Sequence, residues 1–212
     1  MYRYFTLLFF TFLPCISFAQ NGFGAFAGVH GGVFFPSADN VSSVYKNDVF
    51  PIGFHAGVGQ NWFYLTAKYQ KYKTDGTPEV INTANVSLSP TAAWQQSMQF
   101  YGARWYLSRN RINLFTEIGY CAFKSQETID VNNPAYAEFN SQTELKSSGI
   151  GLVFGIEKDI FRYMSINAQV EWMNANYKEN LPGLAGSSSK MGGVLLGLAL
   201  NAKIETIADF SR

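Results

Sequence analysis

The chain is poor in cysteine, in charge and in long apolar runs. It has 212 residues with two cysteines, and 15% of its residues are charged. Lys plus Arg (16) nearly balances Asp plus Glu (15), so no basic excess favours nucleic acid as a partner. No uncharged apolar run of about eighteen residues or more follows the N-terminal segment, which excludes a membrane-spanning helix in the remainder of the chain.

The N-terminal segment has the features of a secretory signal peptide. Arg3 supplies a positive start, residues 5–13 form an apolar stretch, and Ser17-Phe18-Ala19 gives the small-x-small pattern of a cleavage site. We expect residues 1–19 to be the signal peptide and residues 20–212 the mature domain. Cys121 would then be the single cysteine, which excludes an intramolecular disulfide. A lipoprotein leader acylated at Cys15 is the less favoured alternative, because Leu13 and Pro14 precede that cysteine instead of small residues.

Aromatic residues and a two-residue alternation are what the chain has in abundance. Aromatics make up 17% of it, which is high for a soluble protein with so little charge. Bulky apolar residues alternate with small or polar ones in eight segments, at 24–35, 52–60, 62–74, 95–107, 112–124, 147–158, 163–177 and 191–204. Such alternation is typical of strands with lipid on one side and a packed lumen on the other. The sequence therefore predicts an all-β fold, an eight-stranded antiparallel up-and-down transmembrane β-barrel.

The connections between these segments alternate in length. We expect long loops at about 37–51, 75–94, 125–146 and 178–190, and short turns at Gln60-Asn61, 108–111 and 158–162. Every proline after the leader lies in or beside a long loop, as expected for a residue that cannot donate to a sheet ladder. In outer-membrane barrels the turns are periplasmic and the long loops extracellular. We therefore expect extracellular loops and two periplasmic termini.

Charged and histidine side chains fall on the parity opposite to the bulky apolar residues. The outward positions within 52–58, 63–69, 101–107, 114–120, 150–156 and 164–172 carry no charge. The inward parity carries the residues from which we predict a polar network in the lumen: Lys68, Arg104, Glu117, Glu157, Glu171, His30 and His55. Arg104 and Glu117 lie symmetrically about the turn at 108–111, so a hairpin would place them opposite or diagonally opposite each other. An interior filled by its own side chains leaves no wide channel.

Chemical activity has little support in these residues. His30 and His55 are the only histidines, and a metal site would need a third ligand, for which Glu171 is the one conceivable partner. We therefore expect no metal and no cofactor. A lipid A-modifying enzyme would need a nucleophile or base at the outer rim, but both histidines have inward parity. We expect no enzyme activity and keep that class, together with a soluble barrel that binds a small ligand, as alternatives.

Two neighbouring segments carry a resemblance to a known family. Phe100-Tyr101-Gly102-Ala103-Arg104-Trp105-Tyr106-Leu107, a tight turn, and Asn113-Leu114-Phe115-Thr116-Glu117-Ile118-Gly119-Tyr120 resemble the Gly-x-Arg-Tyr-Tyr and aromatic-x-x-Glu-x-Gly hairpin of small outer-membrane barrels. Such barrels are of the OmpA and OmpX type and include the porin-like "outer membrane protein beta-barrel domain". The resemblance implies residence in the outer membrane among its lipids, insertion by the barrel-assembly machinery, and a structural role or a role in contacting a surface partner through the loops. One departure is that Phe210 is followed by Ser211 and Arg212, whereas such chains often end on an aromatic residue.

Overall fold

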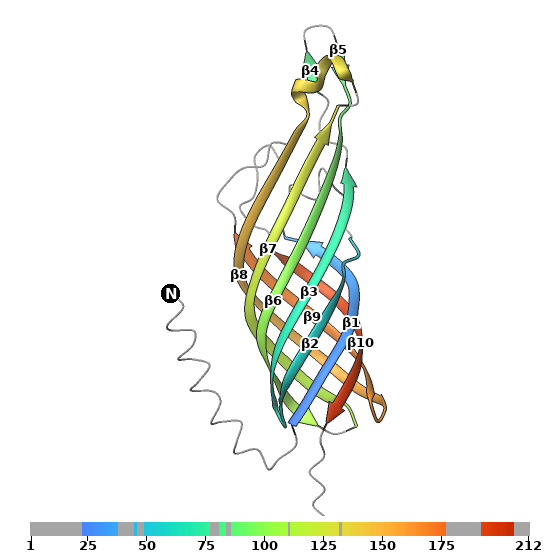
Figure 1. The fold of residues 1–212 in the computed structure, drawn as a ribbon, viewed down its shortest axis with the longest axis vertical. Helices are drawn as coiled ribbons and strands as arrows, with labels where there is room; N and C mark the ends of the chain where they lie inside the picture. The colour runs from blue at the N-terminus through green and yellow to red at the C-terminus, as the bar shows by residue number, and fades with distance from the viewer. Residues whose placement is uncertain are drawn as a thin grey trace, which may run out of the picture.

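Eight antiparallel strands close into one barrel in the computed structural model, which describes residues 23–37, 45, 49–76, 81–83, 86–109, 111–131, 133–176 and 192–205 (Figure 1). Around the barrel the strands follow the order β1-β10-β9-β8-β7-β6-β3-β2. Their bounds are β1 (Phe23–Pro36), β2 (Ile52–Gln60), β3 (Phe63–Gly76), β6 (Thr91–Arg109), β7 (Asn113–Asp130), β8 (Ser141–Phe161), β9 (Met164–Asn176) and β10 (Gly193–Glu205). The predicted fold class is confirmed. The predicted signal peptide lies outside the described residues.

A short hairpin and a 3-10 helix occupy the connections at the long-loop end. The strands β4 (Ile81–Thr83) and β5 (Val86–Leu88) pair with each other in a hairpin between β3 and β6, separate from the barrel sheet. A 3-10 helix, η1 (Pro134–Phe139), connects β7 to β8. The side chain of Asn133 caps its first turn by accepting a hydrogen bond from the backbone N–H of Ala135 at 3.1 Å.

Three strands are much longer than the sequence predicts. β6, β7 and β8 contain 19, 18 and 21 residues, so strand replaces 91–94 of the loop expected at 75–94, and 125–130 and 141–146 of the loop expected at 125–146. Beyond the last pairs with β2 and β9, four strands continue as a projecting sheet, which we define as residues 72–76, 91–97, 124–130 and 141–147. Figure 1 shows these strands rising well above the closed part of the barrel.

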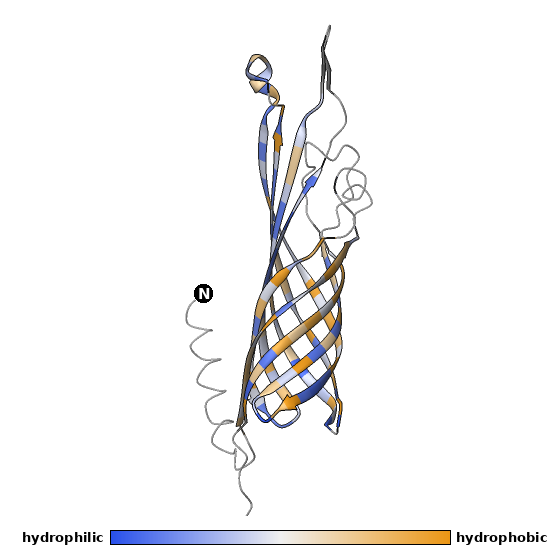
Figure 2. Cartoon of the chain, turned by 90° about the vertical axis from the view of Figure 1, so that its right-hand side faces the viewer, coloured by the Kyte–Doolittle hydropathy of each residue, from blue (hydrophilic) through white to orange (hydrophobic). Residues whose placement is uncertain are grey.

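The outer wall of the closed barrel is an apolar band. Exposed aliphatic and aromatic side chains project from every strand, for example Val29, Phe54, Leu65, Tyr101, Ile118, Phe154, Val170 and Leu198. A soluble protein rarely exposes a continuous surface of this kind, whereas a bilayer requires it. Figure 2 shows hydrophobic residues alternating with hydrophilic ones along the barrel wall, and bluer strands in the projecting sheet. Among the described residues, no helix is long and apolar enough to cross a membrane.

The lumen is narrow because glycines make room for large inward side chains. The Phe100 ring lies against three glycines, at 102, 119 and 151 on successive strands. A Cβ atom on Gly102 would lie 2.5 Å from the ring, and one on Gly119 would lie 2.7 Å from it, so neither position has space for a side chain. This tight packing supports a lumen filled by its own residues.

Candidate functional site

Arg104 and Glu117 form the centre of an ion network inside the barrel. They are direct partners in the β6–β7 ladder, and both are fully buried. The arginine Nε donates to Glu117 Oε1 at 2.6 Å. The guanidinium carbon lies 4.0 Å from the ring centre of Phe115 and 4.5 Å from that of Phe26, so two aromatic faces hold the cation in place.

The network continues from this pair toward both ends of the barrel. Lys68 Nζ lies 3.1 Å from Glu117 and 3.3 Å from Glu171. In the other direction, Arg104 lies 3.4 Å from Glu157. A further lysine, Lys203, lies 2.9 Å from Glu157 and 2.8 Å from Asp159, at the short-turn end. Three cations and four carboxylates therefore connect strands β3, β6, β7, β8, β9 and β10.

Neutral side chains donate further hydrogen bonds to two of the carboxylates. The Gln70 and Gln169 amides donate to Glu171 at 3.3 and 2.5 Å. The Tyr106 hydroxyl donates to Glu157 at 3.2 Å. Because each buried charge has both opposite charges and hydrogen bonds, the network meets the requirement for ions held away from water.

His30 and His55 lie against each other on β1 and β2. Their Nδ1 atoms are 3.2 Å apart, so one ring donates and the other accepts. Both side chains are buried, and neither Nε2 atom has a hydrogen-bond partner among the described residues. In that same part of the chain, no group of three or more His, Cys, Asp or Glu residues could hold a metal ion. The described residues therefore supply no third metal ligand to the histidine pair.

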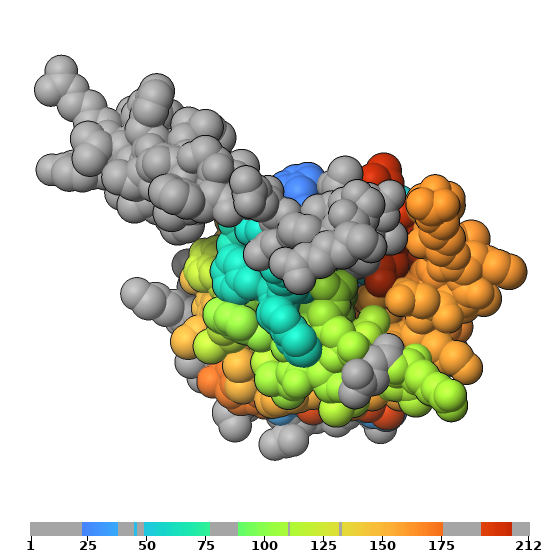
Figure 3. All heavy atoms as spheres, turned by 90° about the horizontal axis from the view of Figure 1, so that it is seen from below, coloured from blue at the N-terminus to red at the C-terminus, as the bar shows by residue number. Residues whose placement is uncertain are grey.

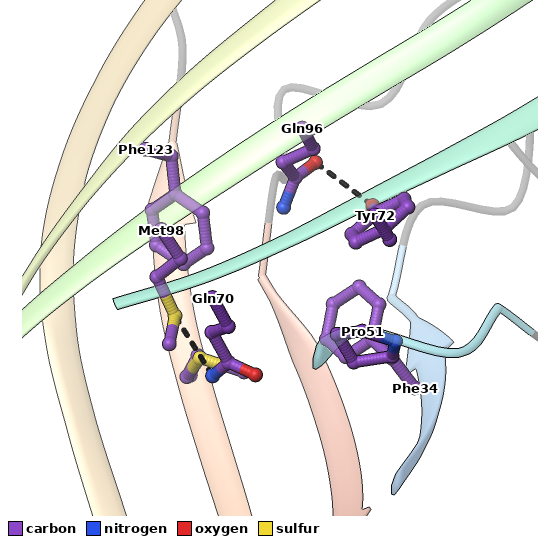
Figure 4. Close-up of a pocket in the computed structure, with 8 residues that line it drawn as sticks. Phe34, Pro51, Gln70, Tyr72, Gln96, Met98 and Phe123 are labelled. Carbon is purple, nitrogen blue, oxygen red and sulfur yellow. Dashed lines mark hydrogen bonds between the residues drawn. The ribbon is translucent and has the colours of Figure 1, made fainter. Parts of the chain in front are cut away.

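A small cavity lies above the histidines, at the long-loop end of the lumen (Figure 4). It has room for about one water molecule, about 10 Å³, between Phe34, Gln70, Met98 and Phe123. The Gln70 amide points to the sulfur of Met98 at 3.8 Å, and the Tyr72 hydroxyl donates to the Gln96 amide oxygen at 3.0 Å. This layer of polar and sulfur-containing side chains narrows the lumen beneath the projecting sheet.

Tyr45, from the connection between β1 and β2, packs on the projecting sheet. Its hydroxyl donates to Glu127 Oε1 at 2.5 Å, and its ring lies 5.6 Å from that of Trp94. Tyr45 also forms a β-bridge with Gly76. Burial, together with the neighbouring Glu127 carboxylate, raises the pKa of the Tyr45 phenol above its usual range. We refer to this contact of Tyr45 with Gly76, Trp94 and Glu127 as the tyrosine clamp.

All seven residues predicted to form the polar network have buried side chains: Lys68, Arg104, Glu117, Glu157, Glu171, His30 and His55. The ion pairs and hydrogen bonds join the five charged ones to one another, whereas the two histidines pair with each other. Sequence reasoning missed Lys203 and Asp159. The inward parity of Lys203 on the last strand was the available signal for the first, and Asp159 has the parity of Glu157. Glu127 was missed because it fell in a predicted loop.

Comparisons with known proteins show similarity in fold and not in sequence. No family model matches the chain, and no curated protein matches it. The outer membrane protein OprG from Pseudomonas aeruginosa is 11% identical, with a TM-score of 0.53 over 86% of this chain and 98% of OprG. A major outer membrane protein from Thermus thermophilus is 7% identical, with a TM-score of 0.56 over 85% and 99% of the two chains. Ail, the attachment invasion locus protein of Yersinia pestis, is 10% identical, with a TM-score of 0.48 over 85% and 99%.

The strand order, the apolar outer band and the filled lumen define the class of the protein. It is a transmembrane β-barrel of the small outer-membrane class. More narrowly, it has the eight-stranded OmpA/OmpX-like fold, as the resemblance in the β6–β7 hairpin predicts.

Proposed function

We propose that the protein is an outer-membrane scaffold that presents its projecting sheet to the cell exterior for contact with a surface partner. The observation that carries the proposal is the sheet itself. Four strands leave the apolar band and continue with their own buried side chains, including Trp94, Ile129 and Leu145. Ordered strands with a packed face hold a fixed shape, and a fixed surface loses less conformational entropy on binding than a flexible loop does.

The same geometry supports an orientation of the barrel in the membrane. The short turns and the described ends of β1 and β10 lie at one end, and the projecting sheet lies at the other. In this proposal residues 1–19 direct export and are removed, and the barrel-assembly machinery inserts the mature chain. The sheet is then extracellular and the termini are periplasmic.

Conduction and catalysis fit the interior less well. The Arg104–Glu117 pair and the Phe100 ring fill the middle of the lumen, which supports a closed barrel without a wide pore. The two histidines face each other inside, so neither is placed to act on a lipid at the outer rim. A soluble ligand-binding barrel would not need the exposed apolar band. We therefore propose a non-enzymatic role.

Labelling of intact cells tests the orientation. A cysteine at Gln142, on the exposed face of the projecting sheet, is expected to react with a membrane-impermeant maleimide. A cysteine at Arg111, in the short β6–β7 turn, is expected to react only after permeabilisation. The native Cys121 is buried, so it adds little background. Labelling of the Arg111 site alone in intact cells would overturn the orientation.

Surface contact is tested separately with cells that express the protein. Their binding to immobilised proteins and to sulfated polysaccharides is compared with that of cells lacking the protein. Changing Lys124, Glu144 and Lys146 to Ser alters the outer face of the sheet without removing buried side chains, so binding is expected to fall in this variant. The matched control is a set of Ser substitutions at the exposed Arg111 and Arg162, at the short-turn end and away from the projecting sheet. The surface-contact role is excluded if parent cells bind no more than barrel-free cells across the panel.

A further inference from the structure

A hollow of about 600 Å³ lies on the outer, lipid-facing wall of the barrel. Its lining includes the outward Ala168 of β9, together with backbone at the neighbouring inward positions Gly155 of β8 and Gly197 of β10. Larger apolar side chains surround them, and the register places Ile156 and Leu198 on either side of Ala168. The small side chain of Ala168 therefore lies in an indentation between two bulkier outward neighbours.

The hollow approaches the short-turn end, where cationic side chains are exposed. Lys158 follows Ile156 by two residues on β8 and has the same outward parity. Arg162 lies in the β8–β9 turn and Arg111 in the β6–β7 turn. Figure 3 views the barrel from this end, where the orange β8–β9 segment projects at the rim. The outward positions within 150–156 are predicted to face lipid and carry no charge. Lys158 lies just beyond them, on the short-turn side.

These cations have no carboxylate partner in the described part of the chain. No described Asp or Glu lies within ion-pair distance of Lys158, Arg162 or Arg111. Asp159, the nearest in sequence, lies 2.8 Å from Lys203, and Glu157 faces the lumen. The opposite end of the barrel differs, because Lys124 and Lys146 both pair there with Glu144. Among the described residues, no carboxylate therefore compensates the positive charge of these three side chains.

Aromatic side chains mark the level at which the rim meets the membrane surface. Phe161 and Tyr163 are exposed beside the turn, and the Arg162 guanidinium lies 5.2 Å from the Tyr163 ring centre. Aromatic residues of membrane proteins concentrate where headgroups meet hydrocarbon. Lysine and arginine near that level extend their charged ends toward headgroups while their methylene stems stay in the apolar layer. The cations are therefore at phosphate depth, and the hollow is at acyl-chain depth.

We propose that this part of the wall is a binding site for one anionic glycerophospholipid, with its phosphate between Lys158 and Arg162 and an acyl chain in the hollow. Arg111 adds positive charge from the neighbouring turn. The small Ala168 lets the acyl chain contact the wall and the larger side chains beside it at the same time. The positive side chains favour an anionic headgroup, and the hollow fixes where on the wall the acyl chain binds. This site lies on the outer wall and depends on neither the partner nor the orientation proposed above.

Native mass spectrometry of the intact barrel, released from mixed micelles, measures this binding. Micelles contain phosphatidylglycerol or phosphatidylcholine at matched concentrations. The parent protein is expected to retain one phosphatidylglycerol in preference to phosphatidylcholine. Lys158→Gln with Arg162→Gln is expected to weaken phosphatidylglycerol retention about tenfold, since each surface cation attracts anionic lipid and salt reduces the effect. Ala168→Leu occupies part of the hollow and is expected to reduce retention of both lipids.

The matched control is Lys71→Gln with Lys73→Gln, which removes the same charge from the other end of the barrel. Heat-dependent electrophoretic mobility verifies that each variant is folded. Unchanged retention in the control, with loss in the other two variants, supports the site. Equal retention of phosphatidylglycerol and phosphatidylcholine by the parent would overturn it. So would an equal loss in the control, because the attraction would then be spread over the whole barrel.

Discussion

Arg104 and Glu117 face each other directly across the β6–β7 ladder, and Arg104 Nη2 lies 2.5 Å from Glu117 Oε1. This alignment depends on a bulge at Leu107. On the turn side of the bulge, Ser108 pairs with Leu114. Continuing that register would put Ile118, an outward residue, opposite Arg104. The one-residue shift between Tyr106 and Ser108 instead brings Glu117 to Arg104 inside the lumen.

Replacing Arg104 should destabilise the barrel strongly. In Arg104→Ala, Glu117 keeps Lys68, but Glu157 and Glu117 both lose a buried cation. Breaking a buried pair from one side typically costs about 3 to 5 kcal/mol. Urea unfolding in lipid vesicles, followed by tryptophan fluorescence, measures the loss. In the control Lys73→Ala, an exposed pair 3.9 Å apart is removed, and about 0 to 1 kcal/mol is expected. Equal midpoints for Arg104→Ala and the parent would contradict the prediction.

The alternation that made the lumen predictable is a property of local geometry. Successive side chains of a strand point to opposite sides of the sheet. Because the apolar residues of β6 and β7 occupy the outward positions, Arg104 and Glu117 were predicted to point inward. Their symmetry about a short turn limited the possible pairings to opposite or diagonal. The bulge at Leu107 decides between these two pairings, and a leucine does not predict a bulge.

Alternation failed in the projecting sheet because its covered face mixes polar residues with apolar ones. Gln96, Ser125 and Glu127 are buried there beside Trp94, and the Gln96 amide oxygen accepts from Ser125. An inward face made of such residues has no apolar period, so the sequence reads as a loop. The contact between His30 and His55 could not be predicted from the sequence either. Their strands pair with His30 opposite Gly53 and His55 opposite Gly28, so the rings meet only on a diagonal.

An arginine on the apolar band should cost more than the same change above it. Ile118 is outward and in the middle of the β7 span, with Ala103 and Leu152 as its neighbours on β6 and β8. Ile118→Arg is expected to lower the free energy of unfolding by about 2 to 4 kcal/mol, the cost at a bilayer midplane. Gln99→Arg, two residues above Tyr101 on β6, is expected to cost about 0 to 1 kcal/mol. Equal costs in vesicles would show that Ile118 does not face hydrocarbon.

Cys121 should report closure of the barrel. Its side chain is fully buried on β7. In the folded protein we expect no reaction with maleimide, and after boiling in detergent we expect full reaction. The unboiled sample should also migrate differently from the boiled one, since a closed barrel does not bind detergent as an unfolded chain does. Rapid labelling of Cys121 without heating, together with identical mobilities, would contradict a closed lumen.

Glu144 should make the projecting sheet sensitive to acid. Hydrogen bonds from Lys124 and Lys146 lower the pKa of its carboxyl. A lowered folded-state pKa adds stability above the ordinary Glu pKa, and that stability is lost as the pH falls through the folded value. Amide exchange at residues 141–147 should therefore quicken below about pH 4. In Glu144→Gln this acid step is expected to disappear. A step of unchanged size in the variant would assign it to another carboxyl.

The tyrosine clamp should open at alkaline pH. Because the pKa of Tyr45 is raised in the folded protein, the unfolded segment ionises first, and stability falls as the pH rises above about 10. Tyr45→Phe removes the hydroxyl that donates to Glu127 at 2.5 Å, and the loss of a donor to a buried carboxylate costs about 1 to 3 kcal/mol. The variant should therefore loosen the clamp at neutral pH but show no further alkaline opening. The amide chemical shift of Gly76 measures the opening of the clamp in both the parent protein and Tyr45→Phe, because Gly76 forms the β-bridge with Tyr45. An alkaline shift of the Gly76 amide that persists in Tyr45→Phe would mean that another group controls the segment.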